Sequence, residues 1–478
     1  MKNRIIGFFI FLFFLKSPVY AEIYDFLDKE YEHNLESYCK DCAKDIQLEE
    51  EITKFLEEKQ IVVSLDECLD IALQNNFDIK SQFETYKSSE YLKKRAYAKF
   101  LPNIGYNFYS IYYRGQVLVG TALVDRFNEL ALSSNVFIEH DLTQGGRQIF
   151  EAKKSKFKKR EHREKLNFTK EKVLMLTASY YWQLLENKIN IEIHIKNLHE
   201  RVAQLRLTEN LKASGMGTEF DIIRQKNEVA NAKRSLIEAM TEYRLQQAKL
   251  SNIMGIELKT TLFPIEEKVE TLNLVDKNIE IDTLYETARK NRKDIKALEN
   301  EIKAMKNEKR AILTDFIPKA KIIGQYQDEG TAALGLGGAV VLGAYADWYL
   351  GENLGVGTFT NAKAKTHEIN SKKHNLTIQL RNIKEELLDS YYHSKLLLKQ
   401  IDITREQVEY ATQSVTLAEM RFDTGVGILL DVIEAQGRKT TARIEYLQSV
   451  IEYNINQIEL LFYQGIIDVD KILKGYNP

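Results

Sequence analysis

The feature that most constrains this chain is a glycine-centred stretch that occurs twice. Residues 421–436 read RFDTGVGILLDVIEAQ and place Gly425 and Gly427 between two long proline-free segments with helical apolar spacing. Glycine readily adopts the left-handed backbone conformation that reverses a chain, so the stretch predicts the turn of a helical hairpin. The first half carries the same pair, Gly215 and Gly217, 210 positions earlier.

The match between the two halves extends well beyond the glycines. At the same spacing, five further residues of the first half recur in the second: Asp221, Ala232, Tyr243, Leu250 and Gly255 as Asp431, Ala442, Tyr453, Leu460 and Gly465. A second series repeats at a spacing of 216 and includes Asp66, Asn75, Asp78, Phe100 and Pro102, which recur as Asp282, Asn291, Asp294, Phe316 and Pro318. Fixed registers of this kind indicate a duplication. We therefore predict repeat 1 over 64–256 and repeat 2 over 281–466.

The first residues indicate export. Lys2 and Arg4 precede an apolar run from Ile5 to Leu15, and the run leads to small residues ending at Ala21. This is the pattern of a cleaved signal peptide, predicted here over 1–21, because the run is shorter than the ~20 residues of a spanning helix. An uncleaved anchor is the alternative. Residues 22–63 form an acidic, helix-prone extension without a counterpart in repeat 2.

The charge balance argues against nucleic acid as a partner. The chain has 67 basic and 69 acidic residues and a net charge of −2, so it has no overall basic field to follow a phosphate backbone. Its mean hydropathy of −0.36 also excludes a bundle of membrane-spanning helices. Any membrane contact must therefore come from β-strands.

Each repeat is predicted to open with a helix and then to form a β-hairpin. The first helix begins at Ser64, where Ser64 and Glu67 form a capping-box pattern. Pro102 and Pro318 mark the points at which helical periodicity gives way to a period of two. We predict hairpins over 102–143 and 318–350, the first with a loop near 114–132 and the second with a glycine-rich reversal near 330–338.

Beyond each hairpin lies a proline-free stretch of unusual length, about 145–213 and about 360–423. At 1.5 Å per residue each helix could reach roughly 100 Å, as coiled-coil helices do. The tip turns are predicted over 214–218 and 424–428, and the return helices stop near Gly255 and Gly465. An irregular linker over 257–280 joins the repeats, and a short tail covers 467–478.

Two hairpins of bilayer-crossing length leave strand edges that cannot face lipid. The four strands of one chain are too few for a barrel, whereas three chains would give twelve, an even number within the bacterial range. The predicted fold is therefore mainly α with a β-barrel part: a duplicated chain that contributes four strands to a 12-stranded transmembrane β-barrel and its long helices to a trimeric α-barrel. The number three is not fixed by the sequence alone.

In this order, and twice over, these motifs resemble the TolC family of outer-membrane factors, from about residue 64 to 466. The resemblance rests on the opening from Leu65 to Asn76, the Phe100-Leu101-Pro102 helix ending, the exit over 141–146 and the turn over 421–436. It implies a homotrimer in the cell outer membrane with a periplasmic extension. It also implies a passive exit duct of a tripartite efflux pump or type I secretion system, working with a periplasmic adaptor, or membrane fusion protein, and an inner-membrane transporter.

The resemblance also assigns roles to particular residues. The residues that match the adaptor-docking tips are Gly215, Met216, Gly217, Gly425, Val426 and Gly427. Asp431 and Glu434, three apart on one helical face, resemble the acids that constrict the periplasmic mouth, and Asp221 is the repeat-1 match of Asp431. Arg224 stands at the repeat-1 position of Glu434, and Gly427 occupies a place where the family often has a basic gating residue.

Aromatic residues near the predicted strand ends are candidates for the interfacial girdles of a barrel: Tyr106, Phe108, Tyr112, Tyr345, Trp348 and Tyr349. Ordinary packing between strands is the alternative for these side chains. A further alternative for the whole chain is a periplasmic coiled-coil scaffold or adaptor protein without a pore.

Catalytic and metal chemistry find no support in the residue pattern. Cys39 and Cys42 suit a small disulfide or idle thiols, and Cys68 falls at a buried position of a predicted helix. The eight histidines have no ligand spacing, and no nucleophile stands beside a base. The Gly335–Gly338 cluster lacks the βαβ setting of a phosphate loop. We therefore expect no enzyme, no metal and no cofactor.

Overall fold

A computed structural model describes residues 61–474, except 120–121, 267–268, 278, 332–334 and 350. The predicted signal peptide, most of the extension over 22–63, Cys39 and Cys42 lie outside the described residues. The chain divides into two compact units. The strand unit comprises Ser81–Phe168 and Lys293–Arg381, and the tip unit comprises the remaining described residues. The prediction of a mainly helical chain with an antiparallel strand part is confirmed.

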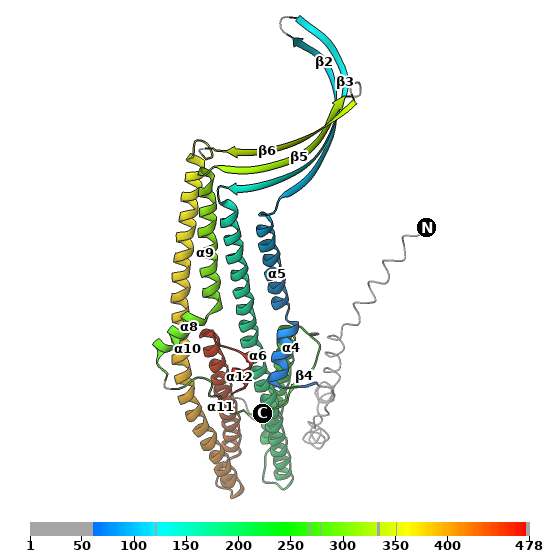
Figure 1. Ribbon diagram of the computed structural model, residues 1–478. Coiled ribbons are helices and arrows are strands. Elements are labelled where there is room, and N and C mark those ends of the chain that lie inside the picture. The colour runs from blue at the N-terminus through cyan, green and yellow to red at the C-terminus, as the bar shows by residue number, and fades with distance from the viewer. Residues whose placement is uncertain are drawn as a thin grey trace, which may run out of the picture. The chain divides into compact units, whose positions relative to one another are not determined.

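The strand unit contains one four-stranded antiparallel sheet in the order β2-β3-β5-β6 (Figure 1). Its strands are β2 (Asn103–Val119), β3 (Ala122–Gln144), β5 (Lys319–Thr331) and β6 (Gly335–Asp347). β2 pairs with β3 and β5 pairs with β6, while β3 and β5 join the two hairpins. Strands β2 and β6 are the edges of this sheet.

The strands of the first hairpin are longer than the sequence suggested, although the hairpin lies close to its predicted bounds. The loop predicted near 114–132 is wrong, because β2 extends to Val119 and β3 begins at Ala122. The glycine-rich reversal predicted near 330–338 is also too wide, because Gly335–Gly338 pair with β5 as part of β6. Glycine signals a turn from sequence, but in a sheet it can instead accommodate a bulky neighbour. A Cβ on Gly338 would lie 2.5 Å from the Tyr326 hydroxyl.

Four helices form one layer in the strand unit (Figure 1). They are α5 (Phe77–Ala98), the first part of α6 (Arg147–Ala213), α9 (Lys293–Leu313) and the first part of α10 (Val356–Asp423). Ion pairs join neighbours: Lys159 to Glu90, 2.9 Å, links α6 to α5, and Lys154 to Glu308, 2.6 Å, links α6 to α9. Ile302, Met305 and Ile369 form the core between α9 and α10.

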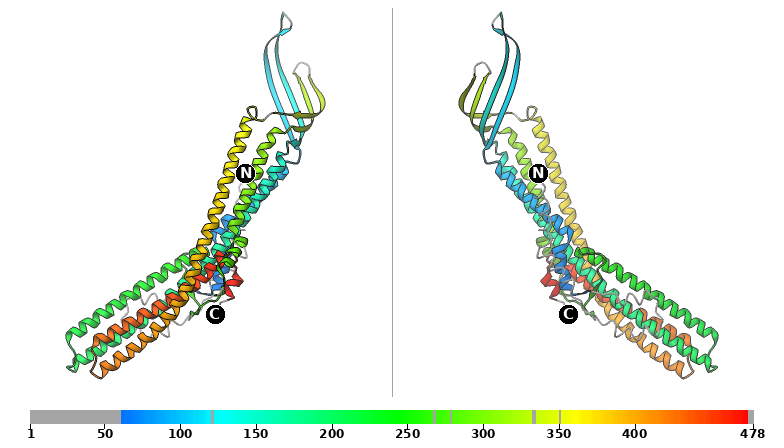
Figure 2. Two further views of the ribbon diagram at one scale, coloured as in Figure 1. Left: turned by 90° about the vertical axis from the view of Figure 1, so that its left-hand side faces the viewer. Right: turned by 90° about the vertical axis from the view of Figure 1, so that its right-hand side faces the viewer.

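The tip unit contains two helical hairpins, which lie side by side in both views of Figure 2. The end of α6 turns into α7 (Glu219–Met254), and the end of α10 turns into α11 (Leu429–Tyr463). Between the hairpins, Lys439 on α11 pairs with Glu200 on α6 at 3.0 Å. Within the second hairpin, Asn456 and Gln457 donate to the hydroxyls of Ser390 and Ser394.

Each repeat opens with a helix that breaks once. In repeat 1, α4 (Leu65–Asn75) ends at Asn76, whose side chain accepts from the amides of Asp78 and Ile79 and so caps α5. In repeat 2, α8 (Ile281–Asn291) ends at Arg292 before α9. The expected capping box of Ser64 and Glu67 is present. Helix α8 begins at Ile281, and its N-cap residue Glu280 forms no capping hydrogen bond with its side chain.

The C-terminal glycines of the return helices pack against these breaks. Gly255 and Gly465 both have positive φ, which suits a helix C-terminus. A Cβ on Gly255 would lie 2.6 Å from the Asn75 carbonyl oxygen, and one on Gly465 would lie 2.7 Å from the Arg292 backbone. The two repeats therefore make the same close approach, which explains why glycine recurs at a spacing of 210.

Part of the linker between the repeats is ordered as strand. Ile61–Val63 (β1) pairs in parallel with Leu262–Pro264 (β4), so the linker predicted as irregular over 257–280 is wrong at these residues. The extension predicted as helix-prone likewise ends in a strand at 61–63. This two-stranded sheet of β1 and β4 is held by α7, because Tyr243 and Gln247 both donate to the Leu262 carbonyl at 2.7 Å. The tail contains the short helix α12 (Val469–Leu473).

Candidate channel lining and helical tips

The four-stranded sheet has one strongly apolar face. Residues directly opposite each other in antiparallel strands point to the same side, so the register defines rows across the sheet. One row is Tyr106, Val136, Tyr326 and Val340, all large hydrophobic side chains with 46–72% of their surface exposed. The next row on this face contains Ile104, Ile138 and Leu342, also exposed. We call this side the apolar sheet face.

The opposite side carries amide and charged side chains in several rows. Its rows include Asn107, Asn135 and Gln327, and Phe137 and Gln325, in the positions between the apolar rows. Polar contacts run across this side: Lys321 pairs with Glu139 at 3.6 Å. Ser133 donates to Glu329 at 3.3 Å. We call it the polar sheet face. A sheet with these two faces can separate lipid from water.

The aromatic candidates divide between the two faces. Tyr106, Phe108 and Tyr112 alternate along β2 on the apolar sheet face and are 58–62% exposed. Tyr345 is different, because it stands opposite Lys321 on the polar sheet face, and the Lys321 ammonium lies 5.8 Å from its ring. A lipid-facing role therefore does not fit Tyr345 in this register.

Trp348 and Tyr349 follow the end of β6 and are 66% and 69% exposed. The Trp348 indole donates to the Phe316 carbonyl at 3.2 Å, which ties the end of β6 to the start of β5. An apolar ring with one polar contact suits a membrane–water interface. Their girdle role remains a prediction.

A chain of alternating charges joins the strands to the helical layer. Lys99 pairs with Glu151 at 2.6 Å, Glu151 with Arg147 at 3.2 Å and Arg147 with Asp315 at 3.1 Å. Asp315 also pairs with Lys319 of β5 at 3.6 Å. Because Lys99 precedes β2 and Arg147 follows β3, the ion pairs connect the ends of three strands. This arrangement fixes where helix gives way to sheet.

Both predicted tips are tight reversals. Gly215 and Gly425 have φ of +83° and +74°, a conformation that strains any side chain other than glycine. At the second glycine of each pair the reason is space. A Cβ on Gly217 would lie 2.9 Å from the Lys212 amide nitrogen, and one on Gly427 would lie 2.9 Å from the Arg421 Cβ. Turn formation alone therefore accounts for all four glycines.

Exposed apolar side chains surround these turns. Met216 is 75% exposed and Val426 is 74% exposed, each between the two glycines of its tip. Phe220 and Ile223 continue this surface at 64% and 59% on the first turns of α7. Single exposed hydrophobic residues are common, but a group at the end of a hairpin marks a candidate protein contact.

The candidate acids differ in how firmly they are held. Asp221 closes a capping box with Thr218: its amide donates to the Thr218 hydroxyl oxygen at 3.2 Å, and its carboxylate accepts from the Thr218 hydroxyl at 2.6 Å. At the matching position of repeat 2 stands Ile428, which has no side chain that can cap. Among the described residues, the Asp431 carboxylate therefore has no hydrogen-bond or ion-pair partner.

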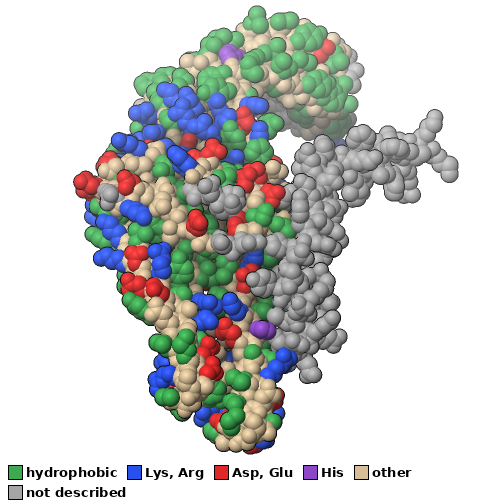
Figure 3. Space-filling view, turned by 90° about the horizontal axis from the view of Figure 1, so that it is seen from below, with side chains coloured by type: hydrophobic (Ala, Val, Ile, Leu, Met, Phe, Trp, Pro, Cys, Tyr) green, Lys and Arg blue, Asp and Glu red, His purple; other side chains and the backbone are tan. Residues whose placement is uncertain are grey.

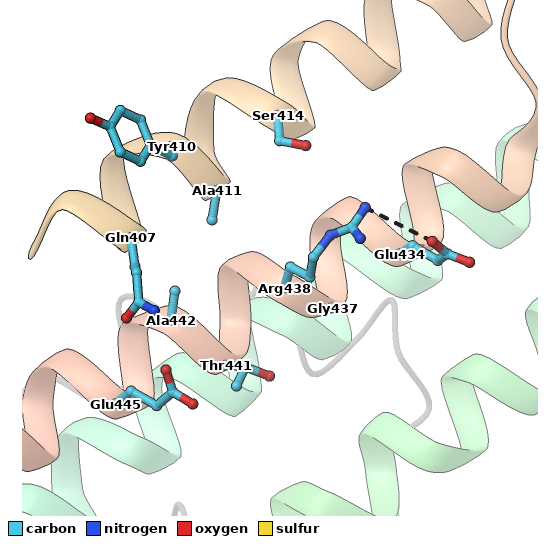
Figure 4. Close-up of a pocket in the computed structure, with 10 residues that line it drawn as sticks. All are labelled: Gln407, Tyr410, Ala411, Ser414, Glu434, Gly437, Arg438, Thr441, Ala442 and Glu445. Carbon is cyan, nitrogen blue, oxygen red and sulfur yellow. Dashed lines mark ion pairs between the residues drawn. The ribbon is translucent and has the colours of Figure 1, made fainter. Parts of the chain in front are cut away.

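Glu434 lies one turn beyond Asp431, is exposed, and has Arg438 at 3.9 Å. Glu434 and Arg438 line a groove of about 800 Å³ between α10 and α11, shown in Figure 4. Gly437 and Ala442 form part of its α11 wall, and Tyr410 part of its α10 wall. The small residues leave room between the helices, so the groove could receive side chains of a partner helix.

Buried acids occur deeper in the tip unit. Burial raises the pKa of Glu186 on α6 to about 7, and the nearby Glu452 on α11 adds to the shift by repulsion. Burial likewise raises the pKa of Glu266, whose backbone carbonyl accepts from Lys188 at 2.8 Å.

Cys68 is a buried free thiol, as expected. Among the described residues, no group of three His, Cys, Asp or Glu could hold a metal.

Comparison with known families tests the resemblance. Residues 284–465 match the family model described as outer membrane efflux protein. The matched segment includes the second hairpin of strands, the groove and the second tip. This segment is therefore similar to the outer membrane efflux protein family. The family resemblance inferred from the sequence is thus confirmed. No curated protein matches the sequence.

Solved outer membrane proteins and channels share the fold. The chain matches CmeC of Campylobacter jejuni, an outer membrane channel, with a TM-score of 0.74 at 14% identity over 86% of this chain and 88% of that one. It also matches VceC of Vibrio cholerae, an outer membrane protein, with a TM-score of 0.71 at 17% identity over 84% of this chain and 96% of that one. A further match is the open state of MtrE of Neisseria gonorrhoeae, with a TM-score of 0.68 at 16% identity over 84% of this chain and 89% of that one. At these identities the likeness shows the fold alone.

Within the described part of the chain, no helix combines the length and apolarity needed to cross a membrane.

The sequence pattern had identified the glycine tips and the aromatic strand, but not the carboxylates on the polar sheet face. Glu139 and Glu329 fall on that face only once the pairing register of β3 and β5 is known. The alternation of polar residues along β3 was the available signal.

Proposed function

We propose that three copies of this chain form an outer-membrane exit duct for efflux or secretion. The apolar sheet face carries the proposal, because two neighbouring rows of large hydrophobic side chains are exposed on it, whereas the opposite face carries amide and charged side chains. Such a surface is stable in contact with lipid and poorly soluble in water. Three chains of four strands would close β2 of one copy onto β6 of the next, giving a 12-stranded barrel without open edges.

In this assembly the polar sheet face lines the pore. Glu139, Glu329 and Lys321 then face the solute, and their charges would influence which ions enter. The helical layer of each strand unit would form one third of an α-barrel. The family match of the second repeat and the fold of the solved channels support this arrangement.

The helical tips are proposed as the docking surface for a periplasmic adaptor. Met216 and Val426 offer exposed apolar contacts at turns of fixed shape, and the groove beside Glu434 could receive a helix. The duct itself would be passive. An inner-membrane transporter would supply the energy, in either a tripartite efflux pump or a type I secretion system.

Asp431 and Glu434 are proposed to constrict the periplasmic mouth. The free carboxylate of Asp431 supports this role, because an acid without a partner can meet a cation or a second subunit. Asp221 contributes less, since its carboxylate already closes a helix cap. Replacing Asp431 and Glu434 by alanine should weaken block by multivalent cations in planar-bilayer recordings. Unchanged block would remove the assignment.

A matched pair of substitutions on β6 tests the membrane role of the sheet. Val340 lies on the apolar sheet face and its neighbour Ala339 lies on the polar one. Arginine or lysine facing lipid near the bilayer centre costs about 2–4 kcal/mol and aspartate somewhat less, whereas a charge facing water costs little. Val340→Asp should therefore reduce heat-modifiable trimers in the outer membrane fraction, and Ala339→Asp should not. Equal effects would contradict the assignment of the faces.

The transported solute needs a cellular test. Deleting the chain and measuring drug sensitivity together with protein export would distinguish an efflux duct from a secretion duct. Purified wild-type protein should also conduct ions across a planar bilayer. A water-soluble periplasmic monomer without conductance would instead favour the scaffold.

A further inference from the structure

The two faces of the helical layer in the strand unit carry basic residues in different environments. On one face the cations are paired with carboxylates. Lys154 and Lys365 share Glu308 at 2.6 and 3.2 Å, and Lys372 pairs with Glu301 at 3.0 Å. Glu301 and Glu308 are seven residues apart and therefore lie on the same side of α9. We call this side the paired face.

The paired face continues into the polar sheet face. Asp315, directly after α9, pairs with Arg147 of α6 at 3.1 Å and with Lys319 of β5 at 3.6 Å. Lys319 is two positions from Lys321, so both lie on the polar side of β5. The other face of the layer must then continue into the apolar sheet face.

That other face carries a series of exposed cations without counter-charges. On α6 and α9 they recur at spacings of three and four residues, so each group forms one helical stripe. The stripes consist of Lys153, Lys156 and Arg160 on α6 and Lys303, Lys306 and Arg310 on α9. Among the described residues, none of these six has a carboxylate within ion-pair distance. We call the six residues the basic stripe.

Nearby acids do not neutralise the basic stripe. Between 149 and 160 the only acid is Glu151, and between 303 and 313 the only acid is Glu308. Glu151 is already paired with Lys99 and Arg147, and Glu308 is already paired with Lys154 and Lys365. An ordinary solvated helix face mixes both signs, as the paired face does. The basic stripe is therefore a surface of one sign.

Exposed apolar residues separate the basic stripe from the strands. Ile149 is 49% exposed and stands four residues before Lys153, and Leu313 is 38% exposed and stands three residues after Arg310. Each stripe thus passes from apolar to basic with distance from the sheet. Figure 3 shows Lys and Arg side chains gathered beside a mainly hydrophobic surface. This order matches the change from hydrocarbon to headgroup in a bilayer.

We propose that the basic stripe binds anionic phospholipid headgroups in the periplasmic leaflet of the membrane that the sheet crosses. This inference rests on the proposed function. Lys153 and Arg160 lie six and thirteen residues from the start of α6, or about 9 and 20 Å along the helix. A headgroup layer about 5–8 Å deep and a Debye length of about 8–10 Å place the upper cations within reach of phosphates.

A solute in the pore fits these cations less well, because they lie on the side of the layer opposite the paired face. The paired face shares its side with the polar sheet face, which would line the pore. Each cation near an anionic surface strengthens binding about fivefold. Three of them therefore provide an effect large enough to measure.

The test uses the full-length protein with two lipids of identical acyl chains, phosphatidylglycerol and phosphatidylethanolamine. Lipid bound to the purified trimer is counted by native mass spectrometry during titration. The wild type should bind phosphatidylglycerol at least tenfold more tightly. K153Q/K306Q/R310Q should lose most of this preference. The control K226Q/K249Q/K399Q, which removes three exposed lysines of the tip unit, should keep it, as should the charge-retaining K153R/K306R/R310K.

The outcomes separate the two proposals. Equal binding of both lipids by a conducting, heat-modifiable trimer overturns the basic stripe as a lipid site and leaves the duct intact. An equal loss of preference in the tip-unit control also overturns it, because the effect would then follow net charge alone. A chain that neither inserts into vesicles nor forms trimers overturns the duct and the lipid site together.

Discussion

Glu186 offers a quantitative test of the buried interior of the tip unit. It lies on α6, partly buried, with Glu452 of α11 as a like-charged neighbour. Burial and then this repulsion raise its pKa from 4.5 to about 7. The charged form is therefore disfavoured in the folded state, and replacing Glu186 by glutamine should remove that cost.

The magnitude follows from the pKa difference. A rise from 4.5 to about 7 corresponds to roughly 3 kcal/mol. Partial exposure of the side chain to solvent reduces this to about 2 kcal/mol. Because the folded-state pKa is the higher one, the folded protein binds the proton more tightly than the unfolded chain does. The stability contributed by protonation is complete below about pH 4.5 and is lost as the pH rises toward 7.

Trp182 provides the measurement. It is 97% buried, one helical turn before Glu186, and the chain has only one other tryptophan, Trp348. In a Trp348→Phe background, urea unfolding followed by Trp182 fluorescence reports on this region. Glu186→Gln should leave the free energy of unfolding at pH 5 nearly unchanged and raise it by about 2 kcal/mol at pH 8.

The informative quantity is the difference in unfolding free energy between variant and parent, because the titration of all other groups cancels in it. Glu452→Gln serves as the matched control, because it removes the repulsion but leaves Glu186 buried. It should recover only part of the gain. If the stability difference between Glu186→Gln and its parent were the same at both pH values, Glu186 would be ionised throughout and the explanation by burial would fail.

Four further substitutions test the hairpin ends. Gly215→Ala should lower the free energy of unfolding by about 1–2 kcal/mol, because φ is positive at Gly215 but the space around it is open. Gly465→Ala should lower it by several kcal/mol, because the added Cβ would also meet Arg292. Equal midpoints of urea unfolding for the two variants would contradict this difference. Thr218→Ala should lower stability by about 1 kcal/mol through loss of the capping box, measured by thermal melting. Ile428→Thr should form the same capping box with Asp431 and raise the free energy of unfolding by up to about 1 kcal/mol. Because the Asp431 carboxylate would then be bound, block by cations in bilayer recordings should weaken. An unchanged block would show that Asp431 is not part of the constriction.

The duplication made much of this fold predictable. Periodicity located the long helices and the tip glycines because those signals are local and lie in long segments. The end of β2 and the start of β3 were predicted wrongly because residues 114–132 mix charged and apolar residues without a clear alternation. Their pairing is decided by the partner strand, residue by residue from Arg114 opposite Asn128, which local propensity does not contain.

The sites were predictable to different degrees for the same reason. The glycine tips are local, and their two physical causes, positive φ and close approach, act within a single turn. The polar sheet face and the basic stripe depend on which residues lie opposite each other in space. Lys153 and Lys154 are adjacent in sequence, yet one belongs to the basic stripe and the other pairs with Glu308. No window of sequence distinguishes them without the position of α9.

The two repeats have also diverged in a way that bears on function. Thr218 and Ile428 occupy the same place before the return helices, and Asp221 and Asp431 stand three residues later in both. In repeat 1 the hydroxyl binds the acid and stabilises the helix end. In repeat 2 the isoleucine gives up that stabilisation, about 1 kcal/mol, and leaves the carboxylate free. A duplicated chain can thus keep one copy of a motif as structure and release the other for a binding role, which is why the uncapped acid is the stronger candidate for the constriction.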